Sequence, residues 1–305
     1  MANSTDNINK YSPFVSVCVP TVGRGIILCN TVEYLLGQNY DNYEIIIADQ
    51  TINHDAETED YLEKVNDRIR YYKLAEQSLT KARNYCIKKA NGEILIFIDD
   101  DVSLEKNFIY YHARNYIDET IFSVGGPVIE DERKKVPRIT ANPLTIMGRP
   151  VLNRSSNIRG QIKGWCGGNM SFRASVFPIV GYFDEKLPKP WWREETDIFF
   201  RMRQKSLKVI YDPDASLNHL RAREGGSQAD RKFGDNPSLN IDVFASQTIF
   251  HLKFYSKFTL PLTIVFQFFW LGLKFNFKNP INLLKSTILM IKGFKKGYKY
   301  FVTNY

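Results

Sequence analysis

The sequence predicts an α/β fold in which a mostly parallel central sheet is flanked by helices. Short apolar runs alternate with helical patterns between residues 13 and 100, which is the order of strand and helix in a parallel sheet. The runs are apolar at successive positions, so we expect both faces of the sheet to be covered. Ligands bind at the carboxyl ends of the strands in such sheets, and functional residues are expected at that edge.

The elements of the first half follow directly from these patterns. The expected strands are 14–20, 43–49, 69–74 and 93–99, and the expected helices between them are 26–38, 56–66 and 79–90. The last of these helices stops at Asn91-Gly92, a pair that disfavours further helix. Asp49 and Asp99 each stand at the carboxyl end of an expected strand, which is the first indication of a site.

The second half of the chain has longer irregular segments. We expect strands at 121–129, 164–172 and 207–211 and a helix at 194–205, with polar loops at 130–163 and 218–236. Loops of this length are usually functional or mobile. The predicted domains are a flexible N-terminus at 1–12, a main α/β domain at 13–237 and C-terminal basic amphipathic helices at 238–305.

The positive charge of the chain is concentrated at its C-terminus. Residues 251–305 contain nine lysines and no arginine, aspartate or glutamate, whereas the preceding part has 32 basic and 33 acidic residues. A basic tail that is also apolar and aromatic favours an anionic membrane surface as partner, and it disfavours nucleic acid.

We expect this tail to form one or two helices that lie on the membrane surface. Residues 258–273 would span about 24 Å as a helix, which is short of the ~30 Å hydrocarbon core. Residues 280–300 mix apolar side chains with lysines, as interfacial helices do. Two alternatives stay open: a pair of helices that cover the sheet, and one short transmembrane segment.

Cysteine usage and the N-terminus predict the compartment. The four cysteines are far apart and form no Cys-x-x-Cys pair, so buried free thiols are expected, and disulfides or a zinc site are not. Residues 1–12 are polar and lack the apolar core of a signal peptide. We therefore expect a cytoplasmic protein that is peripherally associated with the inner face of the cell membrane.

Three consecutive aspartates, Asp99, Asp100 and Asp101, follow a buried strand. Like charges this close raise each other's pKa, and a bound cation removes the conflict. Asp99 and Asp101 are two residues apart and can point the same way, while Asp100 points elsewhere. Carboxylate ligands suit Mg²⁺ or Mn²⁺. The alternative is a solvated turn whose acids cap a helix that begins at Ser103.

Further motifs surround this triplet in a fixed order. They are Val17-Cys-Val-Pro-Thr21, Ile47-Ala-Asp49, Thr80-Lys-Ala-Arg-Asn84, Gly92 to Val102, Gly167-Gly-Asn-Met-Ser-Phe-Arg173, Gly181-Tyr-Phe-Asp-Glu185, Arg193 to Arg201, and Asp212-Pro-Asp-Ala215 with His219. Together they resemble the family 2 glycosyltransferases over about residues 13–225. The resemblance implies the GT-A fold and an inverting transfer from a nucleotide-sugar that is assisted by Mn²⁺ or Mg²⁺.

The resemblance also implies donor and metal residues. The nucleotide would be bound by Pro20, Thr21, Asp49, Arg83, Asp99 and Asp100, and the metal by Asp99, Asp101 and His219. Asp49 would accept a hydrogen bond from an N–H of the base, which both uracil and thymine offer, so UDP- or dTDP-sugars are favoured. The alternatives are that Asp49 caps its strand, that Arg83 is an exposed helix residue, and that His219 is structural.

Glu195 is the expected general base, because in the family's acidic pair the second acid takes this role. The helix N-terminus would stabilise its carboxylate. Two departures from the family pattern stand here: Arg193 replaces a frequent glycine, and glutamate replaces the commoner aspartate. The alternative is an acidic helix start that pairs internally, with Asp197 and Arg201 spaced for such a pair.

The acceptor side is expected to include Trp165, Gly167, Gly168, Asn169, Trp192 and Glu194. An aromatic ring suits the apolar C–H face of a sugar, although a core position is the alternative for each tryptophan. The two glycines would let the backbone approach the ligand, and a simple bulge is their alternative.

These residues predict transfer of a sugar to a hydroxyl of a glycan or lipid-linked acceptor in cell-surface polysaccharide or glycolipid synthesis. A sugar-phosphate nucleotidyltransferase is the alternative enzyme, for which Gly23-Arg-Gly25 is a faint phosphate loop. A non-enzymatic membrane adaptor is the third hypothesis.

Overall fold

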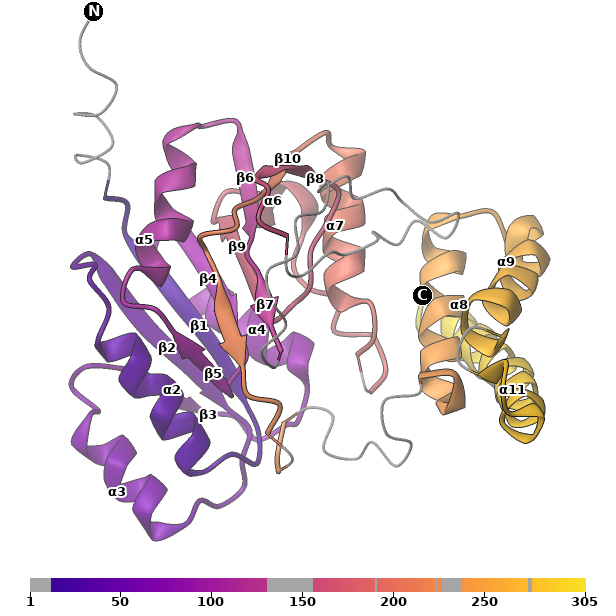
Figure 1. The fold of residues 1–305 in the computed structure, drawn as a ribbon, viewed down its shortest axis with the longest axis horizontal. Coiled ribbons are helices and arrows are strands. Elements are labelled where there is room, and N and C mark those ends of the chain that lie inside the picture. Colours follow the sequence, from indigo (N-terminus) through magenta and orange to yellow (C-terminus); the bar gives the residue numbers. More distant parts are fainter. Residues whose placement is uncertain (1–11, 131–155, 190, 223, 227–236, 274–275) are drawn as a thin grey trace, which may run out of the picture. The chain divides into compact units, whose positions relative to one another are not determined.

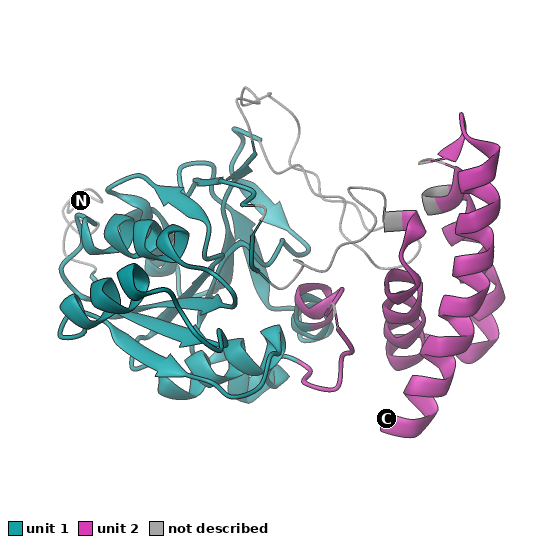
Figure 2. Cartoon of the chain, turned by 90° about the horizontal axis from the view of Figure 1, so that it is seen from below, with its two compact units in different colours: residues 1–183, 198–229 teal, residues 184–197, 230–305 magenta. Residues whose placement is uncertain are grey.

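The computed structural model describes residues 12–130, 156–189, 191–222, 224–226, 237–273 and 276–305. The expected flexible N-terminus up to residue 11 lies outside the described residues, as do residues 131–155 and 227–236 of the two expected polar loops. The chain divides into two compact units, residues 1–183 with 198–229 and residues 184–197 with 230–305 (Figure 2).

The first unit is built on an eight-stranded sheet of order β3-β2-β1-β4-β9-β6-β10-β8. The first four strands in that order are parallel, and they are β3 (Arg70–Lys73), β2 (Tyr43–Asp49), β1 (Val15–Thr21) and β4 (Ile94–Ile98). The other four are β9 (Asn169–Arg173), β6 (Ile121–Gly125), β10 (Lys208–Tyr211) and β8 (Gly160–Ile162). Of these, β9 is antiparallel to both neighbours and β8 is antiparallel to β10, while β6 and β10 are parallel. The predicted mostly parallel α/β sheet is confirmed.

Helices cover both faces of this sheet (Figure 1). The chain passes outward from β1 to β3 through α2 (Ile26–Leu36) and α3 (Ala56–Lys64), and it returns to β4 through α4 (Leu79–Lys89). Because parallel crossovers are right-handed, the return helix lies on the face opposite to α2 and α3. Strands β1 and β4 are neighbours whose connections leave in opposite directions. Their carboxyl ends therefore frame the crevice where ligands bind in such sheets.

A second, three-stranded sheet of order β5-β11-β7 was not expected from the sequence. It consists of β5 (Val102–Leu104), β11 (Leu217–His219) and β7 (Val128–Ile129). The expected strand 121–129 is thus two strands, which Gly126 and Pro127 separate, and Ser103 lies in a strand where a helix start had been one alternative. The short helices α5 (Phe108–Ala113), η1 (Arg114–Ile117) and α6 (Val176–Val180) complete this part of the chain.

The second unit is helical and has a core of its own. Its helices are η2 (Pro237–Leu239), α8 (Ile241–Phe254), η3 (Lys257–Thr259), α9 (Leu260–Gln267), the π-helical η4 (Phe268–Leu273) and α11 (Pro280–Asn304). No helix among the described residues is long and apolar enough to cross a membrane. Segment 184–197, which we had placed in the main domain, belongs to this unit.

Two glycines bring α11 against α8. A Cβ at Gly293 would lie 2.5 Å from the Phe244 Cβ atom, and one at Gly297 would lie 2.5 Å from the Ala245 carbonyl oxygen. Met290 and Phe294 fill the rest of the contact together with Val243 and Phe244. Close backbone approach therefore fixes the inner face of α11 and leaves its other face outward.

We predict that Gly293→Ala destabilises the protein by about 1–3 kcal/mol because it overpacks this contact. At an open helix position the same change would stabilise by roughly 1 kcal/mol. Gly272→Ala is the matched control, since the nearest atom to its Cβ would be 3.6 Å away. The measurement is urea unfolding followed by circular dichroism. Equal stability of the two variants would contradict this packing.

Candidate active site

The three aspartates form the turn between β4 and β5, at the carboxyl edge of the sheet. Their side chains differ in exposure: that of Asp99 is 37% exposed, whereas those of Asp100 and Asp101 are 8% and 3% exposed. The alternative of a solvated turn is therefore wrong for two of the three. Buried carboxylates need a partner, and the structure supplies one from the loop after β1.

Arg24 is that partner, a role that was not predicted from the sequence. Its Nε donates to Asp100 Oδ1 and its Nη2 donates to Asp101 Oδ2, and both donor–acceptor distances are 3.0 Å. Arg24 lies between Gly23 and Gly25, directly after the strand that borders the crevice. That position, at the strand end next to β4, was the available indication of its role.

The same arrangement sets the charges of the turn. Burial raises the pKa of Asp100 to about 6, although Arg24 opposes the shift. Burial also raises the pKa of Asp101, but the hydrogen bond with His219 and the charges of His219 and Arg24 outweigh it and leave the pKa below its ordinary value. For His219, burial lowers the pKa and Asp101 outweighs this, so the net shift is upward.

His219 reaches the turn because β11 pairs with β5, which places it opposite Val102. Its Nε2 lies 3.2 Å from Asp101 Oδ1 and 3.8 Å from Asp99 Oδ2. The structure thus brings together the three side chains predicted to bind metal.

The two carboxylates and the imidazole are donors of the kind that divalent cations bind. Neighbouring ligands of an octahedral ion with bonds of about 2.1 Å are roughly 3 Å apart. Within the described residues, however, no group of three or more histidine, cysteine, aspartate or glutamate side chains is arranged to hold a metal ion by itself. Asp101 Oδ1 faces His219 while Oδ2 is held by Arg24 and by the Ala222 N–H, 2.9 Å away. An open site completed by substrate oxygens matches such a donor set.

The backbone at Gly168 lies directly on Asp99. A Cβ at this position would be 2.4 Å from Asp99 Oδ2, so any larger residue would have to displace the Asp99 carboxylate. Arg83 supports the same loop, since its Nη2 donates to the Gly167 carbonyl over 3.2 Å. Arg83 is 2% exposed and lies over the Phe183 ring. It is therefore not the exposed helix residue of the alternative interpretation.

Asp49 ends β2 opposite Thr21, the last residue of β1, and both are buried. Its carboxylate accepts hydrogen bonds from the Thr51 N–H and the Tyr71 hydroxyl and contacts the His54 ring. Burial raises the pKa of Asp49, but these bonds outweigh it and leave the pKa below its ordinary value. Asp49 thus caps its strand here, and base recognition stays a prediction.

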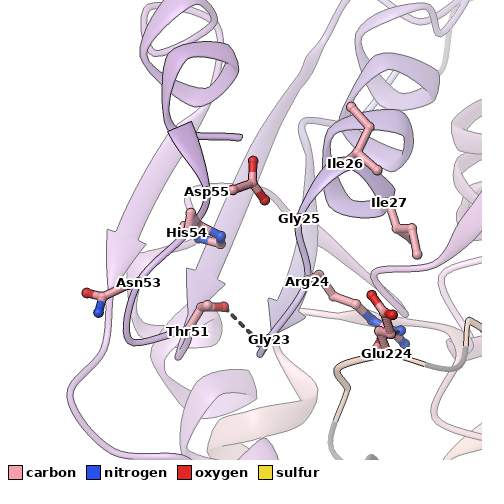
Figure 3. A pocket seen from close by; sticks show the side chains of 10 residues that line it. All are labelled: Gly23, Arg24, Gly25, Ile26, Ile27, Thr51, Asn53, His54, Asp55 and Glu224. Carbon is pink, nitrogen blue, oxygen red and sulfur yellow. Dashed lines mark hydrogen bonds between the residues drawn. The ribbon is translucent and has the colours of Figure 1, made fainter. Parts of the chain in front are cut away.

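A pocket of about 290 Å³ lies beside these residues, between the loops that follow β1 and β2. It is lined by residues 23–27, 51, 53–55 and 224 (Figure 3). Two of these lining residues are hydrogen-bonded to each other: the Gly23 N–H donates to the Thr51 hydroxyl oxygen at a distance of 2.8 Å. The first backbone N–H groups of α2 have no side-chain cap, and such groups favour an anionic ligand.

Two residues expected on the acceptor side are interior instead. The Asn169 amide group donates to the Pro127 and Ala215 carbonyls, and its oxygen lies 2.9 Å from His112 Nε2. Trp165 is 3% exposed and donates to the Gly126 carbonyl over 2.7 Å. Both hold the loops around the site in place, and neither offers a surface to a sugar.

Pro20 lies in β1 of the first unit, whereas Trp192, Glu194 and Glu195 lie in the second unit. Trp192 packs against the helical core, Glu194 is buried, and Glu195 is half-buried in the first turn of α7 (Glu194–Gln204). The expected pair of Asp197 with Arg201 is not formed. Asp197 binds Lys253 Nζ, and Arg201 donates to the carbonyls of Val180, Gly181 and Tyr182.

The backbone of Arg193 explains the departure noted at this position. Its φ is 73°, in the left-handed region where glycine is favoured. The guanidinium lies 4.4 Å from the centre of the Phe250 ring. The arginine therefore carries strain of about 1 kcal/mol or more and gains a ring contact within its own unit.

The family model described as "Glycosyl transferase family 2" matches residues 16–179. The chain belongs to this family. The predicted family is thereby confirmed, and the segment matched contains the aspartate turn, Asp49 and Arg83.

Curated relatives agree with the assignment. The chain is 32% identical to the putative colanic acid biosynthesis glycosyl transferase WcaA of Escherichia coli, covering 67% of this chain and 78% of the relative. It is 24% identical to the glucosyl-dolichyl phosphate glucuronosyltransferase of Haloferax volcanii, covering 67% and 68%. An uncharacterized glycosyltransferase of Rickettsia felis is 25% identical over 77% of this chain, which spans only 38% of that protein.

Solved structures confirm the GT-A fold. The mannosyltransferase PcManGT of Pyrobaculum calidifontis, in complex with GDP-Man and Mn²⁺, matches with a TM-score of 0.58 at 15% identity, covering 92% of this chain and 74% of the other. GalNAc-T7 with UDP, GalNAc and Mn²⁺ matches with a TM-score of 0.64 at 15% identity, covering 95% and 56%.

The buried contact between His112 and Asn169 can be tested through the pH dependence of stability. Burial lowers its pKa to about 4, below the ordinary histidine value of about 6.5. The unfolded chain therefore binds a proton that the folded chain does not, and stability falls as the pH drops from about 6.5 towards 4, by up to about 3 kcal/mol. We predict that His112→Gln flattens this part of the profile in urea titrations. An unchanged slope would show that His112 is not held neutral.

Proposed function

We propose that the chain is an inverting, metal-assisted glycosyltransferase that moves a sugar from a nucleotide diphosphate to a hydroxyl of a glycan or lipid-linked acceptor. The observation that carries the proposal is the convergence of Asp99, Asp101 and His219 at the carboxyl ends of β1 and β4, beside the pocket. Family membership limits the chemistry to glycosyl transfer.

Asp99, Asp101 and His219 would hold the cation, and Mn²⁺ or Mg²⁺ fits the donors. When bound, the cation supplies positive charge to the departing diphosphate. Glu195 accepts the proton of the acceptor hydroxyl. The acceptor oxygen bonds to the anomeric carbon while the bond to the diphosphate breaks on the opposite side. This single displacement inverts the anomeric centre, and the proton remains on Glu195.

The donor we favour is a UDP- or dTDP-sugar. Asp49 accepts an N–H of uracil or thymine in this proposal, and the Tyr71 or His54 contact gives way to the base. The two similar structures contain GDP-Man and UDP, so the fold accommodates more than one base. A panel of UDP-, dTDP- and GDP-sugars, with release of nucleoside diphosphate as the readout, identifies the donor.

We predict that Asp101→Ala and Glu195→Gln each lower the rate of nucleoside diphosphate release by about 10²-fold or more, and that chelation with EDTA does the same. The controls are Asp118→Asn, whose carboxylate pairs with Lys208, and Glu63→Gln on α3, which is exposed. Full activity in EDTA would exclude the metal role. Full activity of Glu195→Gln would exclude Glu195 as the base.

The same assay separates the alternative enzyme. A sugar-phosphate nucleotidyltransferase releases diphosphate and not a nucleoside diphosphate. Its loop around Arg24 would need the guanidinium for phosphates, and here that group is bound to Asp100 and Asp101. A non-enzymatic adaptor predicts that Asp101→Ala and Glu195→Gln leave cellular function intact.

We further propose that the second unit binds an anionic membrane surface from the cytoplasmic side, in the synthesis of cell-surface polysaccharide or glycolipid. The outward side of α11 exposes Ile281, Leu284, Ile288, Ile291 and Val302, each 45% or more. The first four of these positions recur every three or four residues, and lysines lie among them. That pattern suits an interfacial helix. A relative in Campylobacter jejuni is a glucosyltransferase for a glycan linked to diphospho-undecaprenol.

We predict that replacing Ile281, Leu284 and Ile288 by serine lowers binding to phosphatidylglycerol vesicles at least tenfold, because about 25 cal/mol per Å² of apolar burial is lost. Deletion of 251–305 is a poorer test, since it would cut α8. Ile52→Ser is the control, because Ile52 is 87% exposed in the first unit. Binding is measured by flotation with the vesicles. If the triple variant floats to the same extent as the unchanged protein, α11 is not the membrane anchor.

A further inference from the structure

One guanidinium holds three parts of the candidate site. Beyond its two bonds to the aspartate turn, Arg24 Nη1 donates to the backbone carbonyls of Ala222 and Glu224. Both residues belong to the segment that follows β11, residues 220–222 and 224–226, which we call the post-β11 segment. Arg24 is 7% exposed, so these bonds are formed largely out of water, where charged hydrogen bonds are strong.

Backbone hydrogen bonds to the aspartate turn and to the loop after β1 also hold the post-β11 segment. The Leu220 N–H donates to the Asp101 carbonyl over 2.8 Å, and the Ala222 N–H donates to Asp101 Oδ2 over 2.9 Å. The Gly226 N–H donates to the Val22 carbonyl over 2.7 Å. The segment is therefore pinned by its backbone, which makes the contact independent of most of its side chains.

Two glycines allow the segment to lie on the loop after β1. A Cβ at Gly225 would be 2.1 Å from the Gly23 carbonyl oxygen, and φ is 65° at Gly23 and 69° at Gly225. Any other residue at Gly225 would meet backbone atoms, which cannot move aside. The close approach brings the Ala222 and Glu224 carbonyls within reach of Arg24, and Figure 3 shows Glu224 beside Arg24.

The consequence for Asp101 is a fixed carboxylate. Oδ2 is occupied by Arg24 and by the Ala222 N–H, so Oδ1 is left facing His219 at 3.2 Å. Arg24 and a cation at Asp101 would use different oxygens and would not exclude each other. The planar fork of arginine can bind two carboxylates and two carbonyls at once, whereas a lysine ammonium acts as a single point charge.

We propose that Arg24 is a positioning residue that aims Asp101 at the metal position and, through the same guanidinium, holds the post-β11 segment on the aspartate turn. Metal binding and the order of that segment are then coupled. The coupling to metal rests on the proposed metal-assisted function. The contact with the segment does not, and this makes the two parts separately testable.

A role as mere counter-charge makes the opposite prediction. If Arg24 only neutralised the acids, Arg24→Lys would behave like the unchanged protein. Arg24→Gln would then bind cations more tightly, because a competing positive charge is gone. If Arg24 positions Asp101, both variants bind Mn²⁺ more weakly.

The first experiment measures Mn²⁺ affinity of the full chain from the electron paramagnetic resonance signal of free Mn²⁺. We expect at least tenfold weaker binding for Arg24→Lys and Arg24→Gln, and no binding for Asp101→Ala. Arg70→Lys is the matched control, because Arg70 also joins a carboxylate, that of Glu44, to a backbone carbonyl. Affinity in Arg24→Lys equal to that of the unchanged chain overturns the inference, while absence of Mn²⁺ binding by the unchanged chain overturns the metal part of both proposals.

The second experiment follows amide hydrogen exchange of the peptide that covers residues 218–226. We expect exchange at least tenfold faster in Arg24→Lys and Arg24→Gln and unchanged in Arg70→Lys. Saturating Mn²⁺ slows exchange in the unchanged chain but not in the Arg24 variants. Thermal melts that match the unchanged chain within a few degrees distinguish this local effect from general unfolding. Unaltered exchange in both Arg24 variants contradicts the hold on the segment.

Discussion

Two buried carboxylates and one guanidinium share a small volume where β1 and β4 end. Burying a charge is unfavourable by several kcal/mol unless it is paired and hydrogen-bonded. Here Asp100 and Asp101 are paired with Arg24. The pairing ties the loop after β1 to the turn after β4 and leaves one oxygen of Asp101 directed outward. The pairing of β11 with β5 places His219 beside the turn, and Arg24 holds the segment that follows. The geometry of the candidate site therefore depends on the ion pairs together with this strand pairing.

Much of the fold was predictable because its information is local. The four parallel strands and the three helices between them have apolar periodicities that a sequence displays without tertiary context. The small sheet of β5, β11 and β7 was missed, since strands of two or three residues are too short to show a period. The prediction of one continuous strand at 121–129 was wrong because Gly126 and Pro127 interrupt it. Proline lacks the backbone N–H that pairing with a neighbouring strand requires.

The site was predictable to the extent that family motifs mark its residues. Asp99, Asp101 and His219 come together as expected. Arg24 escaped detection because its partners are 76 and 77 residues away, and no local pattern records such a contact. Asn169 was assigned to the acceptor because a motif does not show burial. Its amide group joins two interior loops through hydrogen bonds to the Pro127 and Ala215 carbonyls. A polar residue inside a motif can therefore stabilise the interior instead of binding a ligand.

The order of these residues along the chain has a consequence for biosynthesis. His219 follows Asp101 by 118 positions, so at 5–20 residues per second it leaves the ribosome roughly 6–24 s later. During that interval the nascent polypeptide already contains both the acidic turn and Arg24. An internal counter-ion for the turn is then present before His219 exists, so the acids can pair with Arg24 without a metal. Synthesis itself thus separates neutralisation of the turn from completion of the proposed cation site.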